Sequence, residues 1–304
     1  MTNKLNKTII SLITPFIIFS IFSCSDPIPQ DPEHVKEIDD WHAKRIENLK
    51  KETGWLNLVG LFWLEEGKNK IGSDKSMDII FPEGKADDYI GTIIKSGEYL
   101  TFITNPASEN FSESKRVKTI ALQSDNEENT TYLTHKTLKW HIIKRGDRYG
   151  IRLKDLEAEL LTTFKGIERY PVSLDWKIEA ETIPYDTPKQ IIIPSIIGTK
   201  DTVLVENYIQ FVFNGNAYKL DPQTSGNRFF IIFADETNGK ETYGAGRFLY
   251  VDGPDSSSNK FTLDFNKAYN PPCAFTEYAT CPLPPKDNYL KLEIEAGEKN
   301  WGNH

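Results

Sequence analysis

Residues 201–220, DTVLVENYIQFVFNGNAYKL, contain two runs of largely alternating apolar and polar residues around an Asn-Gly pair. Alternation with a period of two is typical of β-strands that are buried on one face. Asn-Gly is a strong signal for a two-residue hairpin turn, because both residues tolerate a positive φ. The stretch therefore predicts a β-hairpin that turns at Asn214 and Gly215.

Similar short runs extend in both directions from this hairpin. Upstream the chain reads YIGTIIKSGEYLTFIT and TTYLTHKTLKWHIIKRGDRYGIRLKD, and downstream it reads RFFIIFAD, GRFLYVD and FTLDF. Short strands at intervals of about ten residues, separated by Gly, Asn and Asp clusters, indicate a β-sandwich or barrel. We predict an all-β fold, sandwich or barrel-like, made of two packed β units.

One segment departs from this pattern. Residues 35–49 place Val35, Ile38, Trp41 and Leu49 at helical spacing, and Gly54 stands where a helix would end. We predict one N-terminal amphipathic helix there.

The N-terminus has the features of a bacterial export signal. Lys4 and Lys7 precede an apolar block at residues 9–22, which is too short for an ordinary membrane span. The following sequence IFSC resembles a lipobox, whose cysteine becomes the lipidated mature N-terminus. We expect an exported protein, attached to the membrane of the cell envelope through lipid on Cys24, on its periplasmic or surface face.

The chain is predicted to divide into four parts. They are a signal peptide at 1–23, a tether at 24–34, the helix with a first β unit at 35–165, and a second β unit at 166–304.

The other two cysteines lie in a loop that is rich in proline, residues 264–285, DFNKAYNPPCAFTEYATCPLPP. If Cys24 carries lipid, Cys273 and Cys281 remain as a pair, and a disulfide between them suits an oxidising compartment. Two buried free thiols are the main alternative, and a metal-binding or catalytic thiol is another.

Charge and residue types limit the possible partners. The formal net charge is −8, and loss of residues 1–23 would remove Lys4 and Lys7 and no acid. An acidic chain is not suited to bind nucleic acid. The five histidines form no recognisable metal motif and no nucleophile elbow is present, so we predict no metal and no cofactor.

Four stretches together resemble the bacterial family called domain of unknown function 1684. They are WHAKRIENLKKETGWLNLVGLFWLEEGKNKIGS, RYPVSLDWKIEA, FADETNGKETYGAGRFLYVD and DFNKAYNPPCAFTEYATCPLPPKDNYLKLEIEAGEK. This resemblance implies kinship and no established activity.

The first β unit is faintly similar to forkhead-associated domains, which are β-sandwiches that bind phosphothreonine. Ile71 and Gly72 match the opening of that family, but Ser73 stands where its phosphate-binding arginine is expected. The similarity therefore indicates a fold and not phosphopeptide binding.

The polar residues around the 264–285 loop are the first candidates for a functional site. Arg247 lies on a predicted strand from which it could pair with Asp264 across a hairpin. In a structural interpretation the loop is a rigid plug. In a functional one, Asp264 or Glu277 acts as acid or base, and a ligand is held by Arg247, Asn266, Tyr269, Asn270 and Tyr278.

A second candidate rim is the charged cluster of Arg145, Arg148, Arg152 and Asp155, in which Arg152 is a further possible ligand-binding residue. These features favour an envelope lipoprotein that works as a binding or interaction module for an unknown protein or small molecule. The alternative is a hydrolase, or a protein that binds a small anionic ligand near Arg247, Asp264 and the two cysteines.

Overall fold

The structure is a computed structural model that describes residues 31–254 and 257–302. The predicted signal peptide and Cys24 lie outside the described residues. Within these ranges, no helix is long and apolar enough to cross a membrane.

The predicted N-terminal helix is confirmed as α1, Pro32–Lys50. The Asp31 side chain caps it by accepting a hydrogen bond from the Glu33 N–H, and Pro32 occupies the first turn, where its missing N–H costs nothing. Ile38 and Leu49 are buried on one face. This amphipathic helix therefore uses a narrow apolar stripe to dock on the rest of the molecule.

Residues 58–155 form two packed sheets, with strand orders β1-β11-β10-β9-β6-β7 and β3-β2-β4-β5-β8. Their apolar faces meet in one core, in which Trp140 packs edge-on against Phe102 with ring centroids 5.2 Å apart. The strands are β1 (Leu58–Trp63), β2 (Gly67–Gly72), β3 (Ile79–Ile80), β4 (Gly91–Ser96), β5 (Tyr99–Thr104), β6 (Phe111–Ser112), β7 (Lys115–Arg116), β8 (Thr119–Ala121), β9 (Tyr132–His135), β10 (Leu138–Arg145) and β11 (Arg148–Asp155).

Residues 177–264 form the sheets β14-β13-β12-β18 and β15-β16-β17 around a second core. The predicted hairpin is confirmed, since β13 and β14 pair around Asn214 and Gly215, with φ of 48° and 76°. The strands are β12 (Lys177–Pro194), β13 (Lys200–Phe213), β14 (Asn216–Leu220), β15 (Gln223–Ser225), β16 (Arg228–Phe233), β17 (Arg247–Asp252) and β18 (Lys260–Asp264).

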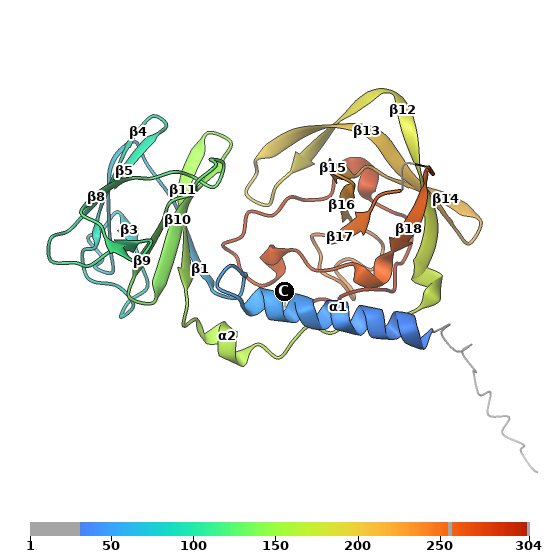
Figure 1. Ribbon diagram of the computed structural model, residues 1–304, viewed down its shortest axis with the longest axis horizontal. Coiled ribbons are helices and arrows are strands. Elements are labelled where there is room, and N and C mark those ends of the chain that lie inside the picture. Colours follow the sequence, from blue (N-terminus) through green and yellow to red (C-terminus); the bar gives the residue numbers. More distant parts are fainter. Residues whose placement is uncertain (1–30, 255–256, 303–304) are drawn as a thin grey trace, which may run out of the picture.

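Short helical turns complete the chain. The predicted all-β fold with one main N-terminal helix is confirmed (Figure 1). The turns are α2 (Glu159–Thr163), η1 (Leu174–Trp176), η2 (Phe265–Lys267), η3 (Pro272–Ala274) and η4 (Lys286–Asn288).

Helix α1 runs along the second β unit (Figure 1), although the sequence grouped it with the first. Its Arg45 donates to Glu298, and its Glu37 pairs with Lys267. Ile46 and Leu49 pack in a small cluster with Phe275 of the proline-rich loop. Contacts remote in sequence therefore fix the helix to the C-terminal part of the chain.

Candidate functional site

Arg247, which was predicted to bind an anionic ligand, is completely buried. Its guanidinium donates to Asp235 Oδ2 at 2.7 Å and to the Ile294 carbonyl at 2.9 Å. The predicted pairing with Asp264 is wrong, because β17 pairs with β16 while β18 pairs with β12 in another sheet. In this structure Arg247 therefore serves as an internal cross-link.

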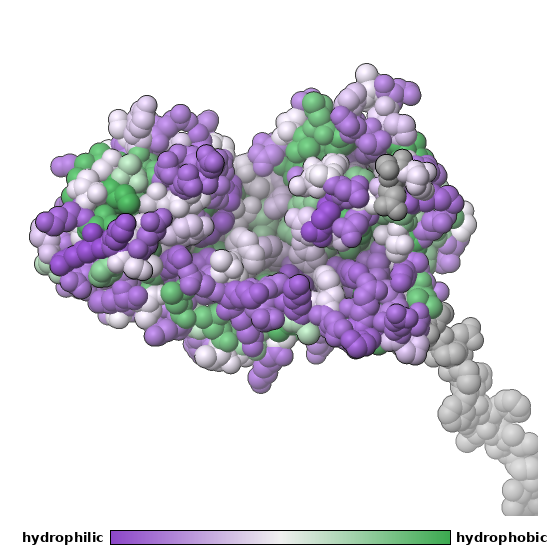
Figure 2. All heavy atoms as spheres, in the orientation of Figure 1, coloured by the Kyte–Doolittle hydropathy of each residue, from purple (hydrophilic) through white to green (hydrophobic). Residues whose placement is uncertain are grey.

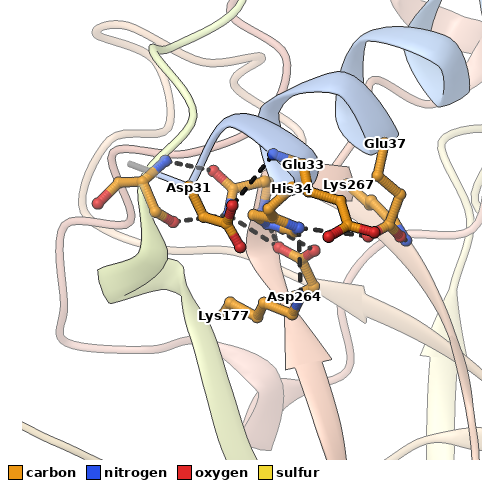
Figure 3. Close-up of polar contacts among 9 residues, drawn as sticks. Asp31, Glu33, His34, Glu37, Lys177, Asp264 and Lys267 are labelled. Atoms are coloured by element: carbon orange, nitrogen blue, oxygen red, sulfur yellow. Dashed lines mark hydrogen bonds and ion pairs between the residues drawn. The ribbon is translucent and has the colours of Figure 1, made fainter. Parts of the chain in front are cut away.

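Asp264 is also engaged inside the fold (Figure 3). Its Oδ1 accepts hydrogen bonds from the backbone and side-chain amides of Asn266, and its Oδ2 lies 3.3 Å from Nε2 of the buried His34. On the other side of His34, Nδ1 lies 3.3 Å from both Glu37 Oε2 and Lys177 Nζ. This cluster ties the first turn of α1 to the start of β12 and the end of β18.

The other candidate site residues around the proline-rich loop make separate contacts and do not form one site. Asn266 exchanges hydrogen bonds with the backbone of Ser173, and Asn270 donates from its side chain to the Lys299 carbonyl. Tyr269 lies beneath the Arg45 guanidinium at 4.3 Å, and burial raises its pKa. Glu277 is exposed and Tyr278 is half-buried. Asp264 lines a surface cavity, whereas Arg247 is completely buried and Glu277 is exposed elsewhere, so the three side chains do not converge on that cavity.

The predicted disulfide is absent, since Cys273 and Cys281 are both free thiols. They are nevertheless adjacent, and the Cys273 N–H donates to Cys281 Sγ at 3.0 Å. A hydrogen bond from the Cys281 thiol lowers the pKa of Cys273, and the same bond together with burial raises the pKa of Cys281. The alternative of two buried free thiols therefore describes this structure.

A pocket of about 430 Å³ lies between the two β units, where Figure 2 shows the surface hollowed into a notch. The first unit contributes Arg145 and Arg152, and Trp55 from the segment before β1 joins them. The second unit contributes an apolar wall, and the proline-rich loop contributes Thr280 and Cys281. The apolar wall consists of Ile193, Val203, Phe230 and Phe248.

Arg152 is the most unusual side chain of this pocket. It is only 7% exposed, and within the described ranges no carboxylate pairs with it. One terminal nitrogen donates to Thr280 Oγ1 at 3.1 Å, the guanidinium lies 5.3 Å from the Trp55 ring, and Nε has no hydrogen-bond partner. Burial, followed by the charge of Arg145, lowers the pKa of Arg152 to about 10. The pocket thus holds a cation that lacks a counter-ion.

Neighbouring charges leave this region positive. Arg145 is neutralised by Asp125, to which it donates at 3.1 and 2.8 Å. Lys154 donates to the backbone carbonyls of Glu52 and Gly54, and burial together with Arg152 lowers its pKa to about 8. Asp201 also lines the pocket, but it lies on an exposed part of β13. An anion that enters would therefore meet a positive potential at the Arg152 end.

The proline-rich loop joins the two units at this point. Thr276 Oγ1 donates to the Leu58 carbonyl at 3.2 Å, and Thr280 Oγ1 accepts from both Arg145 and Arg152 at 3.1 Å. On the other side, the Ile196 N–H donates to the Cys281 carbonyl, in the turn between β12 and β13. The loop is therefore a shared wall of the two units and the pocket.

The sequence singled out Arg152, the surrounding arginine cluster and the proline-rich loop with Cys281, but not the other residues that line this pocket. Trp55, Ile193, Phe230 and Thr280 come from segments far apart in the chain, so no local motif unites them. The one local signal was the number of cations in residues 145–152. Among the residues that the structure describes, no group of three or more potential metal ligands is found.

His141 makes the stability of this region depend on pH. It pairs in register with Arg152, and burial, followed by the charge of Arg152, lowers its pKa to about 4, with Asp125 acting in the opposite direction. Between pH 6.5 and 4 the unfolded imidazole binds a proton that the folded one does not, so stability falls as the pH falls. We expect this residue to account for a loss of about 3 kcal/mol between pH 7 and pH 4.

Urea unfolding of wild type and His141→Gln at several pH values measures this loss. Carboxylates titrate in the same range, so the informative quantity is the difference between the two proteins. A difference that stays constant from pH 7 to pH 4 would contradict the assignment to His141.

Comparisons with known proteins give a match to one family model over part of the chain. Residues 162–299 match the family model described as protein of unknown function, DUF1684. This confirms the resemblance over the C-terminal part of the chain. No curated protein matches the chain.

Among solved structures, an uncharacterized protein of Haloarcula marismortui is 28% identical, over 45% of this chain and 78% of that one, with a TM-score of 0.38. An FhaA FHA domain complexed with the intracellular domain of Rv3910 is 13% identical, over 31% and 97%, with a TM-score of 0.23. Mycobacterium tuberculosis EmbR in complex with a low affinity phosphopeptide is 11% identical, over 42% and 32%, with a TM-score of 0.21. FHA domains, the second predicted resemblance, are thus among the weak neighbours, and this likeness implies no shared ligand.

Proposed function

We propose that this chain, whose residues 162–299 match DUF1684, binds a small organic anion in the pocket between its two β units. The observation that supports this most directly is Arg152, a guanidinium that is 7% exposed and has no carboxylate partner among the residues that the structure describes. Burial of an unpaired charge is costly, and an anion beside it would restore the missing interactions. A carboxylate or phosphate also matches the planar fork of donors that arginine presents.

The remainder of the pocket favours an apolar body on this ligand. Phe230, Phe248, Trp55 and Pro272 line the pocket and also line a second cavity of about 260 Å³ that continues towards Tyr269. A volume of this size suits a small molecule, and its side walls offer mainly carbon surface. The ligand class is therefore an amphipathic carboxylate or phosphate ester, with its charged group at Arg152.

We also propose that export and lipid attachment at Cys24 place this pocket at the membrane surface of the cell envelope. The support is the basic, apolar and cysteine pattern of residues 1–24. A hydrolase that uses Arg247, Asp264 and Glu277 receives no comparable support, because the first two are engaged internally and the third is exposed.

Replacement of Arg152 by Gln should weaken anion binding by about 10- to 100-fold, the effect of losing hydrogen bonds to a charged group. Calorimetric titration of the wild type with octanoate and benzoate, and with octanamide and benzamide as neutral counterparts, measures this effect. We expect the acids to bind more tightly than the amides, and the preference to disappear in Arg152→Gln.

Arg148→Gln is the matched control, because Arg148 is an exposed arginine of the same strand that stacks on Trp63 outside the pocket. It should leave binding unchanged. Equal affinities of acids and amides for the wild type, or equal losses in both variants, would refute the proposed site.

A further inference from the structure

We propose that Cys273 and Cys281 are a redox-active dithiol that exchanges with small anionic disulfides entering the pocket. The inference uses the same pocket as the proposed function, but the thiol pair is the observation that supports it. Cys281 lines the pocket, and Cys273 lies next to it with its N–H on Cys281 Sγ. Two thiols in contact, one of them facing a cavity, are the arrangement that thiol–disulfide exchange requires.

The surroundings favour a thiolate in this pair. The two thiols are 9% and 4% exposed, so outside the pocket they are covered by the protein. The Cys281 hydrogen bond lowers the pKa of Cys273 and stabilises a thiolate there. The same bond and burial raise the pKa of Cys281, and the charge of Arg152 offsets only part of that rise. A nearby cation together with a second thiol is typical of reactive rather than inert cysteines.

The same cation selects the co-reactant. A disulfide that carries carboxylates can place one of them at Arg152, and its sulfur atoms then lie on the Cys281 side of the pocket. A cationic disulfide of similar size would be repelled by Arg152, whose charge is not neutralised as that of Arg145 is by Asp125. The substrate class is therefore a low-molecular-weight disulfide with negative charge.

The exchange balances as two displacements. Cys281 Sγ attacks one sulfur of the ligand and passes its proton to the Cys273 thiolate, while the ligand S–S bond breaks and one thiolate leaves and is protonated by water. Cys273 then loses its proton to solvent and attacks Cys281 Sγ, which expels the second ligand thiolate. The two protein thiols are oxidised to a Cys273–Cys281 disulfide, and one ligand disulfide is reduced to two thiols.

Oxidation should also alter the wall of the pocket. Cys281 follows Thr280, whose hydroxyl accepts from Arg145 and Arg152, and Tyr243 donates to the Cys273 carbonyl at 3.2 Å. A covalent link between the two sulfur atoms would constrain both ends of the loop. The redox state and the arginine site are thereby coupled through Thr280.

The test uses reduced protein with glutathione disulfide, cystamine and hydroxyethyl disulfide as the anionic, cationic and neutral probes. Intact mass spectrometry follows the loss of two hydrogens and the transient adduct. We expect glutathione disulfide to react about tenfold faster than cystamine, with the difference lost in Arg152→Gln and retained in Arg148→Gln. Octanoate should protect the thiols in the wild type.

Single cysteine variants identify the order of attack. Cys273→Ser should accumulate a glutathione adduct on Cys281, and Cys281→Ser should remain unmodified. Thiols that react only after unfolding, or equal rates with all three probes, would overturn the inference.

The two proposals can fail independently. If the thiols are inert while octanoate binds as described above, the thiol inference alone fails. If exchange shows the expected charge selectivity while octanoate and benzoate do not bind, the proposed organic-anion ligand alone fails.

Discussion

Asp235→Ala should destabilise the protein by about 3–5 kcal/mol, because it removes the partner of a fully buried cation. Arg247 and Asp235 have no exposed side-chain surface, and their closest atoms are 2.7 Å apart. The carboxylate also accepts from the backbone and hydroxyl of Thr237 and from the Ile294 N–H. Alanine would leave the Arg247 charge without its counter-ion and remove the acceptor of the Thr237 and Ile294 N–H groups.

Chemical denaturation of Asp235→Ala, with Asp252→Ala as the control, measures this effect. Asp252 is also a carboxylate that pairs with an arginine, Arg228, but both lie on the surface at 85% and 59% exposure. Its loss should hardly change the unfolding midpoint. An Asp235→Ala/Arg247→Met double variant should recover part of the lost stability, since it removes the unpaired charge. Equal midpoints for the two alanine variants would show that the buried pair is not important for stability.

The sequence was most informative where a local pattern determines the structure. The period-two runs predicted β-strands, Asn214 and Gly215 located the turn between β13 and β14, and the apolar spacing before Gly54 predicted α1. Each of these features depends on neighbours within a few residues. The sequence grouped the helix with the first β unit, whereas its ion-pair partners Glu298 and Lys267 are more than 200 residues away in the C-terminal part of the chain.

The contacts of the candidate site residues could not be predicted from local sequence patterns. Arg247 and Asp264 follow one another on successive strands, so a hairpin was the natural prediction, but β18 crosses to β12. Asp235, the actual partner of Arg247, comes from the segment after β16 and has no distinguishing sequence signal. Arg152 was noted among several arginines, and only the fold shows that it lacks a counter-ion and faces a pocket. The order of the strands in the sheets therefore determines which charged side chains meet. That order depends on contacts between residues that are remote in sequence.

Glu298→Ala should weaken the docking of α1 and destabilise the protein by about 2–4 kcal/mol. Glu298 is buried, and its two oxygens accept from Arg45 Nε at 2.5 Å and from the Asn270 N–H at 2.8 Å. Arg45 in turn donates to the Asn270 carbonyl and covers the Tyr269 ring. One carboxylate thus joins the helix to the start of the proline-rich loop.

Limited trypsin digestion and urea unfolding together test this role. The helix contains several lysines and arginines, so a loosened α1 should be cleaved sooner in Glu298→Ala than in wild type. Glu298→Gln should lie between them, because an amide oxygen can still accept from Asn270 but carries no charge for Arg45. Glu295→Ala is the control, since Glu295 is an exposed carboxylate of the same segment. Cleavage of the helix at the wild-type rate in Glu298→Ala would mean that the apolar contacts of Ile38 and Leu49 suffice to dock it.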